Sequence, residues 1–366
     1  MTKFHFIPYA ERIMDIQQIA STNQSQSELK NQNANVLIII SLIFLFFSVT
    51  GNAGGIDNCT TAPSSSLVVN VKDKGAKGDG ITDDTAAIQA AVNQVAGTGG
   101  TVLVPDGTYL IDAITSIQIK SDMTLQMSKD TLLKALPNSK DGYNIIKIIG
   151  ASNINVIDGT LIGDRDEHSG VSGQWGMGIN LHSATNIAIN GVTARNCWGD
   201  GFYIAGASKN IKFCSVIADN NRRQGMSIIS VDGMVVKNSI FKNTGGTAPQ
   251  AGIDLEPNKK DTITNVQIVN SQFIGNKGYG IQLSQGAGST NEVTIDGNTI
   301  SSNAGGILTY NTTGHKIINN VLKDNQNYGI RLNGSKGNTV TGNTVTGKNG
   351  IKDEVGGNTV SGNILN

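Results

Sequence analysis

The stretch GFYIAGASKNIKFCSVIADNNRRQGMSII (201–229) decides the fold, because it begins and ends with the same pattern. In both places a glycine precedes alternating apolar residues, which is typical of a strand with one buried face. Between them, NIKFCSVIADN (210–220) carries a second strand signal that ends in turn-forming residues. The glycine pattern occurs eight times from residue 178 to residue 350, at intervals of 21 to 28 residues. The chain is therefore a repeat protein of short strands, without helical periodicity inside the repeats.

Repeats made only of strands cannot bury an apolar face unless they stack on one another. The turns are too short for crossover helices, so we predict an all-β fold, a right-handed parallel β-helix with about 4.8 Å between coils. A leucine-rich horseshoe would need an LxxLxLxxN spacing, which is absent, and a β-propeller would need repeats of roughly 40–45 residues. Turn asparagines tolerate left-handed backbone and bond to neighbouring coils, which explains them structurally. They are Asn196, Asn220, Asn243, Asn276, Asn303 and Asn325.

The segment before the repeats predicts a cap. We divide the folded part into an N-terminal cap module (67–115) and a β-helix (116–366). A helix is expected at about 84–96, with Thr82 or Asp83 as its N-cap. Its apolar stripe would cover the open end of the solenoid. The stripe consists of Ile88, Ala91, Val92 and Val95.

The first 66 residues are interpreted as targeting sequence. Residues 36–49 (VLIIISLIFLFFSV) are too short for a membrane span, which needs about 20 residues, and suit the core of a signal peptide. We assign residues 1–53 to a signal peptide or membrane anchor with a long n-region, and residues 54–66 to a linker. The expected location is secreted, periplasmic or at the cell surface, with residues 36–49 as the candidate membrane contact.

Composition limits the partners. The 366 residues carry 28 Lys+Arg and 28 Asp+Glu, so the formal net charge is zero and we expect no nucleic-acid partner. Three cysteines are too few for a disulfide framework, and no Cys/His spacing suggests zinc. We expect Cys197 and Cys214 to be small buried apolar residues.

The cap module also carries a family resemblance. NVKDKGAKGDGITDDTAAIQAAV (70–92) followed by GGTVLVPDGTYLI (99–111) resembles the opening of the pectate-lyase-like superfamily, which includes polygalacturonases, rhamnogalacturonases, phage depolymerases and mannuronan C5-epimerases. The resemblance implies the β-helix fold and action on a polysaccharide, usually acidic, outside the cytoplasm. The NTD, DD, GHG and RIK motifs of polygalacturonases and the DPHE motif of C5-epimerases are not intact here. The resemblance therefore does not imply one reaction.

Stacked coils bring residues at equal offsets from the strand glycine next to each other. At offsets of one and three the residues are apolar and should face the core, whereas alternate positions should face outward. Three residues before the glycine, Trp175, Trp198 and Arg222 stand on successive coils, and Tyr203 faces outward. Sugar rings bury their C–H faces against aromatic rings, so the three aromatic residues are candidates for substrate binding. The alternative for both tryptophans is packing under a loop.

Acidic residues lie on the same coils. Asp254 and Glu256 are alternate residues of one strand, about 7 Å apart, and Asp200 lies two coils away. Carboxylates about 6.5–9.5 Å apart act as acid and base around a water in inverting glycosidases, so these three are our candidate catalytic residues. Alternatively they bind Ca²⁺ through oxygen ligands, or they form a solvated polar face. Arg222 and Arg223 would neutralise a substrate carboxylate or serve as a lyase base.

One repeat is longer than its neighbours, and its surplus lies in residues 163–177, where charged residues are densest. Long loops on repeat scaffolds often build the binding face. We therefore add Asp164, Arg165 and His168 to the substrate-binding candidates, together with His182 on the next strand. Either histidine is also a candidate acid or base.

These patterns lead to a functional hypothesis. We expect an exported enzyme that cleaves an acidic, galacturonan-like polysaccharide by glycosidic hydrolysis, without a cofactor. The nearest alternative is a polysaccharide lyase or a C5-epimerase-like enzyme, and a lyase could use Ca²⁺. A non-catalytic carbohydrate-binding surface protein is the second alternative, favoured by the missing family motifs.

Overall fold

The computed structural model describes Cys59 and residues 65–366. The predicted signal peptide or anchor (1–53) and most of the predicted linker lie outside the described residues. Within the part that is described, no helix is long and apolar enough to cross a membrane.

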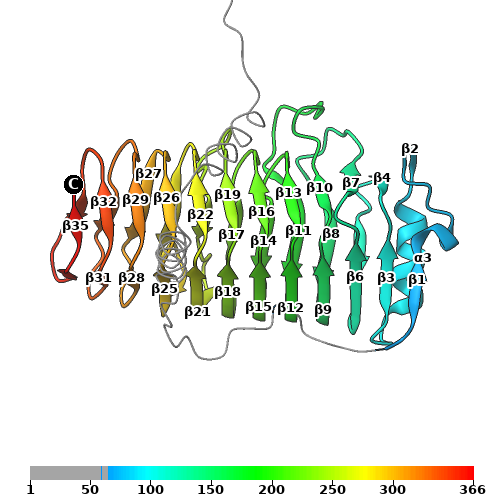
Figure 1. Cartoon of the computed structure of the whole chain (residues 1–366), viewed down its shortest axis with the longest axis horizontal. Coiled ribbons are helices and arrows are strands. Elements are labelled where there is room, and N and C mark those ends of the chain that lie inside the picture. Colours follow the sequence, from blue (N-terminus) through cyan, green and yellow to red (C-terminus); the bar gives the residue numbers. More distant parts are fainter. Residues whose placement is uncertain (1–58, 60–64) are drawn as a thin grey trace, which may run out of the picture. The chain divides into compact units, whose positions relative to one another are not determined.

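The described chain winds through three parallel sheets, A, B and C, in each successive coil, and each strand pairs with its equivalent in the next coil (Figure 1). This is the predicted parallel β-helix. The turn asparagines have both predicted roles, because some adopt left-handed backbone and others bond to a neighbouring coil. Asn196, Asn220 and Asn243 have positive φ angles, whereas buried Asn276 donates its backbone N–H to Asn303 Oδ1 of the next coil at 2.9 Å.

Sheet A forms one long face of the solenoid. Its strands are β1 (Val68–Asn70), β3 (Thr101–Val104), β6 (Met123–Met127), β9 (Ser152–Ile157), β12 (Thr185–Asn190), β15 (Ser208–Cys214), β18 (Val231–Lys237), β21 (Thr262–Val269), β24 (Ser289–Thr290), β25 (Val293–Asp296), β28 (Lys316–Ile318), β31 (Thr339–Thr341) and β34 (Thr359–Ser361).

Sheets B and C complete each coil. Sheet B contains β2 (Asp79–Asp83), β4 (Gly107–Ile111), β7 (Thr131–Ala135), β10 (Thr160–Ile162), β13 (Thr193–Arg195), β16 (Ile217–Asp219), β19 (Ile240–Lys242), β22 (Gln272–Ile274), β26 (Thr299–Ser301), β29 (Val321–Lys323), β32 (Thr344–Thr346) and β35 (Ile364–Leu365). Sheet C contains β5 (Ile117–Ile119), β8 (Gly142–Ile149), β11 (Trp175–His182), β14 (Phe202–Ala205), β17 (Met226–Ile228), β20 (Ile253–Leu255), β23 (Tyr279–Ser284), β27 (Gly305–Tyr310), β30 (Ile330–Asn333) and β33 (Ile351–Asp353).

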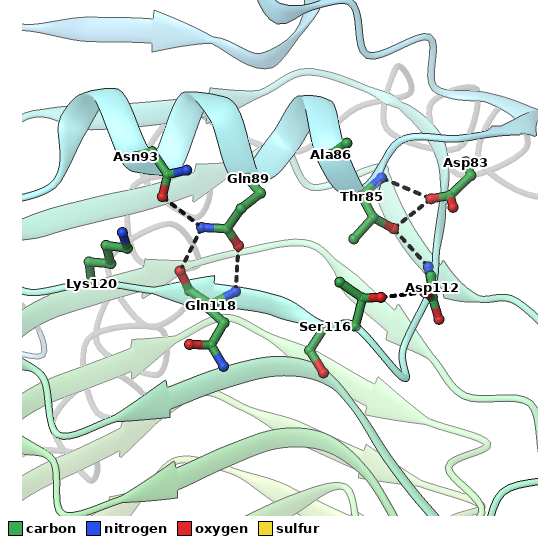
Figure 2. Close-up of a pocket in the computed structure, with 10 residues that line it drawn as sticks. Asp83, Thr85, Ala86, Gln89, Asn93, Asp112, Ser116, Gln118 and Lys120 are labelled. Carbon is green, nitrogen blue, oxygen red and sulfur yellow. Dashed lines mark hydrogen bonds between the residues drawn. The ribbon is translucent and has the colours of Figure 1, made fainter.

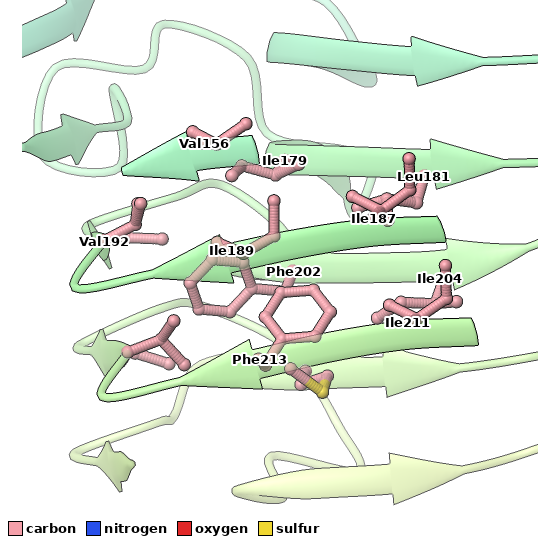
Figure 3. Close-up of a cluster of buried hydrophobic side chains, with 14 of the residues drawn as sticks. Val156, Ile179, Leu181, Ile187, Ile189, Val192, Phe202, Ile204, Ile211 and Phe213 are labelled. Atoms are coloured by element: carbon pink, nitrogen blue, oxygen red, sulfur yellow. The ribbon is translucent and has the colours of Figure 1, made fainter. Parts of the chain in front are cut away.

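The core lies inside the coils, as the alternating pattern predicted. The residues one and three positions after the strand glycines from Gly178 to Gly329, such as Ile179 and Leu181, are fully buried, whereas those after Gly350 are partly exposed. Figure 3 shows them packed against sheet A, where the rings of Phe202 and Phe213 meet edge to face with centroids 5.2 Å apart. Because the inward positions are filled this way, the alternate side chains of sheet C must point away from the core.

The N-terminal end carries the 3-10 helix η2 (Val71–Lys74) and the helix α3 (Thr85–Val95). All four residues of the predicted apolar stripe are buried, which confirms that α3 packs on the end of the solenoid. The N-cap prediction was wrong by one residue. Asp84 is the N-cap, but its carboxylate accepts hydrogen bonds from the backbone of Lys77 and Gly78, while Asp83 accepts from Thr85 N at 3.0 Å.

A polar groove of about 510 Å³ lies between α3 and β5 (Figure 2). The side-chain amide of Gln89 bridges it, because Nε2 donates to Gln118 O at 3.1 Å and Oε1 accepts from Gln118 N at 2.8 Å. Gln89 thus pairs with the edge of sheet C much as another strand would, and this protects the edge. The polar groups of this groove therefore attach the capping helix to the edge of sheet C.

The cysteines require a correction. Cys214, at the end of β15, forms a disulfide with Cys59, 155 residues earlier in the chain. Cys197 is free and buried, as expected. The sequence count did not reveal the pair, because the partner lies in the segment that we had assigned to a linker. Disulfides persist in oxidising compartments, so this bond indicates a location outside the cytoplasm.

Candidate active site

Successive coils of sheet C align their outward residues into one row, which we call the outer column. It runs through the middle of the sheet and passes from amide and lysine residues to a tyrosine, a serine, an aspartate and then further cations. Its members in order are Gln118, Lys147, Asn180, Tyr203, Ser227, Asp254, Gln282, Leu308, Arg331 and Lys352.

The three predicted catalytic acids lie around one arginine beside the middle of this column. Arg223 Nη1 donates to Asp200 Oδ2 at 3.4 Å and to Ser227 Oγ at 3.1 Å. Its Nη2 donates to Glu256 Oε1 at 2.8 Å. Asp254 stands directly after Ser227 in the column. We call Asp200, Arg223, Asp254 and Glu256 the carboxylate cluster.

Burial changes the proton affinity of the two aspartates. Both side chains are inaccessible to solvent. Burial raises the pKa of Asp200 to about 7, although the Arg223 charge and the Ser227 hydroxyl oppose the shift. Burial, followed by the charge of Glu256, raises the pKa of Asp254 well above its ordinary value. A carboxyl group in such a site therefore holds its proton at a pH where an exposed one has lost it.

The hydrogen bonds also locate the protons. Ala251 N donates to Gln224 Oε1 at 2.8 Å, which fixes the orientation of that amide, so Nε2 must donate to Asp254 Oδ2, also at 2.8 Å. Ser227 Oγ donates to Asp200 Oδ2 at 2.8 Å. In each aspartate Oδ1 is buried and finds no partner among the described residues. The proton of each neutral aspartic acid therefore belongs on Oδ1.

Tyr203 and Glu256 form the accessible rim of the cluster. The Glu256 side chain is 27% exposed, compared with 13% for Arg223 and 0% for Asp200. Tyr203 is half-buried, and burial, followed by the Asp200 charge, raises the pKa of its hydroxyl. A ligand on sheet C thus meets a tyrosine and a carboxylate first, with the buried aspartates beneath them.

The loop before β11 is held by buried polar contacts. Asp164 Oδ2 accepts from His168 Nδ1 at 2.8 Å and from Asn138 Nδ2 at 2.9 Å. The Asp164 and His168 side chains are both 0% exposed. Tyr143 Oη accepts backbone N–H groups from Asp164 and Trp198, each at 3.1 Å. The structure therefore places Asp164 and His168 in support of the loop, where solvent does not reach them.

Trp198 is not open for a sugar. Its ring stacks on His168 with centroids 4.0 Å apart, and the Arg222 guanidinium lies 3.8 Å from its centroid. Two planar groups this close to one centroid must occupy opposite faces of the ring. The indole N–H donates to Ser172 O at 3.0 Å. For Trp198 the packing alternative therefore describes this structure, and the ring fastens the loop to the coil.

The other predicted aromatic and cationic residues remain accessible. Trp175, at the start of β11, is 54% exposed. Arg222 Nη1 donates to Gly173 O at 2.8 Å, and Arg165 Nη1 donates to Asn220 O at 2.8 Å. Burial, followed by the charge of Arg165, lowers the pKa of Arg222. These two arginines thus form a small positive region beside the cluster.

His182 lies apart from the cluster. It is exposed at the end of β11, where its Nδ1 contacts Ser183 Oγ at 3.1 Å. Sequence reasoning did not single out Ser227 and Gln224, which orient the two aspartates. The available signal was their position, because Ser227 shares its offset with Asp254 and Gln224 shares its offset with Asp200.

The carboxylate cluster is not arranged as a cation site. Arg223 already bonds to both Asp200 and Glu256 and supplies the positive charge between them. Across Cys59 and residues 65–366 no group of three or more His, Cys, Asp or Glu side chains is placed to hold a metal ion.

Three family profiles match successive parts of the chain. One described as "Rhamnogalacturonase A/epimerase, pectate lyase-like" matches residues 68–147. One described as "Right handed beta helix region" matches residues 115–292, which agrees with the predicted handedness. One described as "Periplasmic copper-binding protein (NosD)" matches residues 249–366.

Several named proteins are similar in sequence. The chain is 30% identical to the uncharacterized protein YclG of Bacillus subtilis over 273 residues, 64% of this chain and 46% of YclG. It is 31% identical to mannuronan C5-epimerase AlgE4 of Azotobacter vinelandii over 194 residues, 48% of this chain and 33% of AlgE4. It is 28% identical to plasmin and fibronectin-binding protein A of Streptococcus pneumoniae over 297 residues, 75% of this chain and 38% of that protein. The chain thus spans less than half the length of each.

Solved structures agree with the fold. The AlgE4 A-module superimposes with a TM-score of 0.65 at 21% identity, covering 82% of this chain and 95% of the module. PfbA, a surface adhesin of S. pneumoniae, gives a TM-score of 0.62 at 18% identity, covering 78% of this chain and 86% of that one. Together with the three parallel sheets and the profile that matches residues 115–292, these likenesses show a right-handed β-helix fold, and residues 68–147 match the pectate lyase-like profile.

Proposed function

We propose that this protein hydrolyses glycosidic bonds in an acidic, galacturonan-like polysaccharide, with the carboxylate cluster as its catalytic centre. The observation that carries the proposal is the environment of Asp254. Its side chain is fully buried, its pKa is raised, and its Oδ1 has no partner among the described residues. A carboxylic acid kept neutral by burial is the usual general acid of glycoside hydrolysis.

The acid step uses the proton on Asp254 Oδ1. Gln224 donates to Oδ2, so Oδ1 is the oxygen that can give a proton to the leaving glycosidic oxygen, which reaches it when the rim formed by Tyr203 and Glu256 moves aside. The bond between that oxygen and the anomeric carbon then breaks, and Asp254 becomes the carboxylate. Gln224 stabilises the new charge, because its N–H already points at the group.

Glu256 is the matching base. It is partly exposed and forms an ion pair with Arg223, so it is present as a carboxylate that water can reach. Asp254 and Glu256 are alternate residues of an extended segment, so their backbones are about 7 Å apart. A carboxylate separation of that order would leave room for a water between them. Glu256 takes a proton from this water while the oxygen of the water bonds to the anomeric carbon. The spacing predicts inversion at that carbon.

Asp200 affects the proton affinity of this pair of carboxyl groups. It shares Arg223 with Glu256, and its pKa of about 7 means that it loses its proton near neutral pH. Its negative charge is among the causes that raise the pKa of Asp254. We therefore assign Asp200 a positioning and electrostatic role, with no cofactor needed for the two proton transfers.

Acidic sugars fit the surroundings. Arg165 and Arg222 form a positive region beside the cluster, and Trp175 offers an exposed ring on the preceding coils. Cation and ring together suit a sugar that carries a carboxylate. The disulfide and the likeness to a surface adhesin support a secreted, periplasmic or cell-surface location.

The test is a panel of polymers: polygalacturonate, polymannuronate, rhamnogalacturonan and neutral galactan. We expect new reducing ends from an acidic polymer, with the first product in the inverted anomeric form by NMR. Retention of configuration would remove Glu256 as the base. Failure to release fragments from any polymer would overturn hydrolysis altogether.

A uronate lyase or C5-epimerase is the second candidate, favoured by the 31% identity to AlgE4. Elimination would yield an unsaturated uronate that absorbs near 230 nm, whereas epimerisation would change the sugar without shortening the chain. Either result in the same panel would replace the hydrolase, and a calcium requirement would be tested then. Binding without any turnover would instead favour a carbohydrate-binding surface protein, in line with the likeness to PfbA.

A further inference from the structure

The outer column continues beyond the carboxylate cluster. After Asp254 it passes through Gln282 and Leu308 to Arg331 and then Lys352. Arg331 is three coils from Asp254, which corresponds to about 14 Å along the solenoid. All candidate residues from the sequence lie at or before Glu256, so Arg331 and its neighbours have no assigned role.

Arg331 stands in an aromatic setting. Its Nε donates to Glu354 Oε1 at 2.7 Å, and its interactions with Glu354 and then with Tyr279 raise its pKa. Its guanidinium also lies 5.6 Å from the centre of the Tyr328 ring. Glu354 uses Nε, so the terminal nitrogens of the guanidinium keep donor capacity for a ligand. The side chain of Arg331 is one third exposed.

The Tyr279 ring packs against the next coil. A Cβ added to Gly305, which follows Tyr279 in register on β27, would collide with the Cδ1, Cε1 and Cζ atoms of the ring. The ring therefore packs directly against the backbone of Gly305, and the residue remains partly exposed. Tyr279 and Tyr328 have the same position before their strand glycines, two coils apart.

Lys352 adds a second cation to the outer column. Lys352 is exposed on the coil after Arg331, while Glu354 is the acid that pairs with Arg331. The region thus combines two cations on the outer column with two tyrosines beside it. A ring face and a cationic donor are what a sugar with a carboxylate requires.

We propose that Tyr279, Tyr328, Arg331 and Lys352 form a distal subsite for an acidic sugar unit of the same polymer that the carboxylate cluster cleaves. The inference rests on the proposed function and extends it. It places the polymer along the outer column, parallel to the solenoid axis, with several sugar units between the two sites. Long chains therefore gain affinity that a short oligosaccharide cannot reach.

The test compares a long and a short ligand. Asp254→Asn in the full chain prevents cleavage, and in this background dissociation constants are measured for polygalacturonate and for trigalacturonate. Arg331→Ala should lower the ratio of trimer to polymer dissociation constants roughly tenfold, the usual effect of losing one charge-assisted contact. Arg331→Lys should restore part of it. Lys316→Ala is the matched control, because Lys316 is an exposed cation of the same coils on sheet A.

An unchanged ratio in Arg331→Ala would overturn the subsite. So would a lowered melting temperature with equal weakening for both ligands, since that result assigns the cluster to coil packing. If the parent protein cleaves polygalacturonate while Arg331→Ala matches the control, the subsite alone fails. If the parent neither binds nor cleaves any acidic polymer, the proposed function fails and the subsite with it.

Discussion

Two sets of buried polar side chains lie in the same solenoid and differ in whether all their polar atoms have hydrogen-bond partners. The asparagine row Asn276–Asn303–Asn325 satisfies its amides from coil to coil, with each Nδ2 bonded to a backbone carbonyl of a preceding coil. The carboxylate cluster leaves Asp200 Oδ1, Asp254 Oδ1 and Arg223 Nε buried without partners among the described residues. Unpaired buried polar atoms cost free energy, so their concentration in one cluster needs an explanation beyond folding. The asparagine row has the character of scaffold, and the cluster that of a site.

The largest expected effect distinguishes the carboxylate cluster from the asparagine row by its contribution to activity. Asp254→Asn keeps the shape of the side chain and an oxygen for the Gln224 N–H, but it cannot supply a proton. We expect turnover to fall at least about 100-fold, with the melting temperature nearly unchanged. Reducing-end release from the polymer cleaved in the panel measures this, with Asp130→Asn, at an exposed turn, as control. Turnover within a few-fold of the parent protein would remove Asp254 from the mechanism.

The second-largest expected effect distinguishes the asparagine row from the carboxylate cluster by its contribution to the free energy of unfolding. Asn303→Ala removes the oxygen that accepts from Asn276 N and Nδ2, and it leaves the Phe273 carbonyl without its donor. We expect the free energy of unfolding to fall by about 2–4 kcal/mol, because buried backbone groups lose their partners. Denaturant unfolding measures it, with exposed Asn327→Ala as the matched control. A loss no larger than that of the control would mean that the row is not a scaffold.

The third effect is a pH dependence of stability. Burial raises the folded-state pKa of Asp200 to about 7, above the ordinary value of 3.8. The folded protein therefore holds this proton more tightly, and the resulting stabilisation is complete below about pH 4 and is lost as the pH rises to about 7. The melting temperature of the wild type relative to Asp200→Asn should fall across that range. A relative melting temperature that rises with pH would contradict the raised pKa.

The smallest effect concerns the accessible aromatic residue. Trp175 is 54% exposed, so Trp175→Ala should leave stability almost unchanged. Loss of a stacking surface should raise KM roughly three- to tenfold with kcat retained. Val171→Ala, at a 94% exposed position of the preceding loop, is the control. Equal KM values for the two variants would show that no sugar stacks on Trp175.

Much of the fold followed from the sequence, because the repeat itself encodes it. Once coils stack, residues about 24 positions apart become neighbours, which predicted the buried positions and brought Asp200 near Asp254. Contacts outside the repeat could not be predicted this way. Trp198 is enclosed because the loop carrying His168 folds back over it, and Cys59 reaches Cys214 from outside the repeats. Neither contact leaves a periodic signal.

The central claim is that Asp254 stays protonated in the folded protein where ordinary aspartates are ionised. Carboxyl-carbon NMR of the wild type and of Asp254→Asn tests it directly across a pH titration. We expect two aspartate resonances, those of Asp200 and Asp254, to keep the chemical shift of a neutral acid at a pH where the exposed aspartates have ionised, and only the Asp254 resonance to be absent from the variant. If the resonance that is lost in Asp254→Asn ionises together with the exposed aspartates in the wild type, Asp254 cannot be the acid that the mechanism requires.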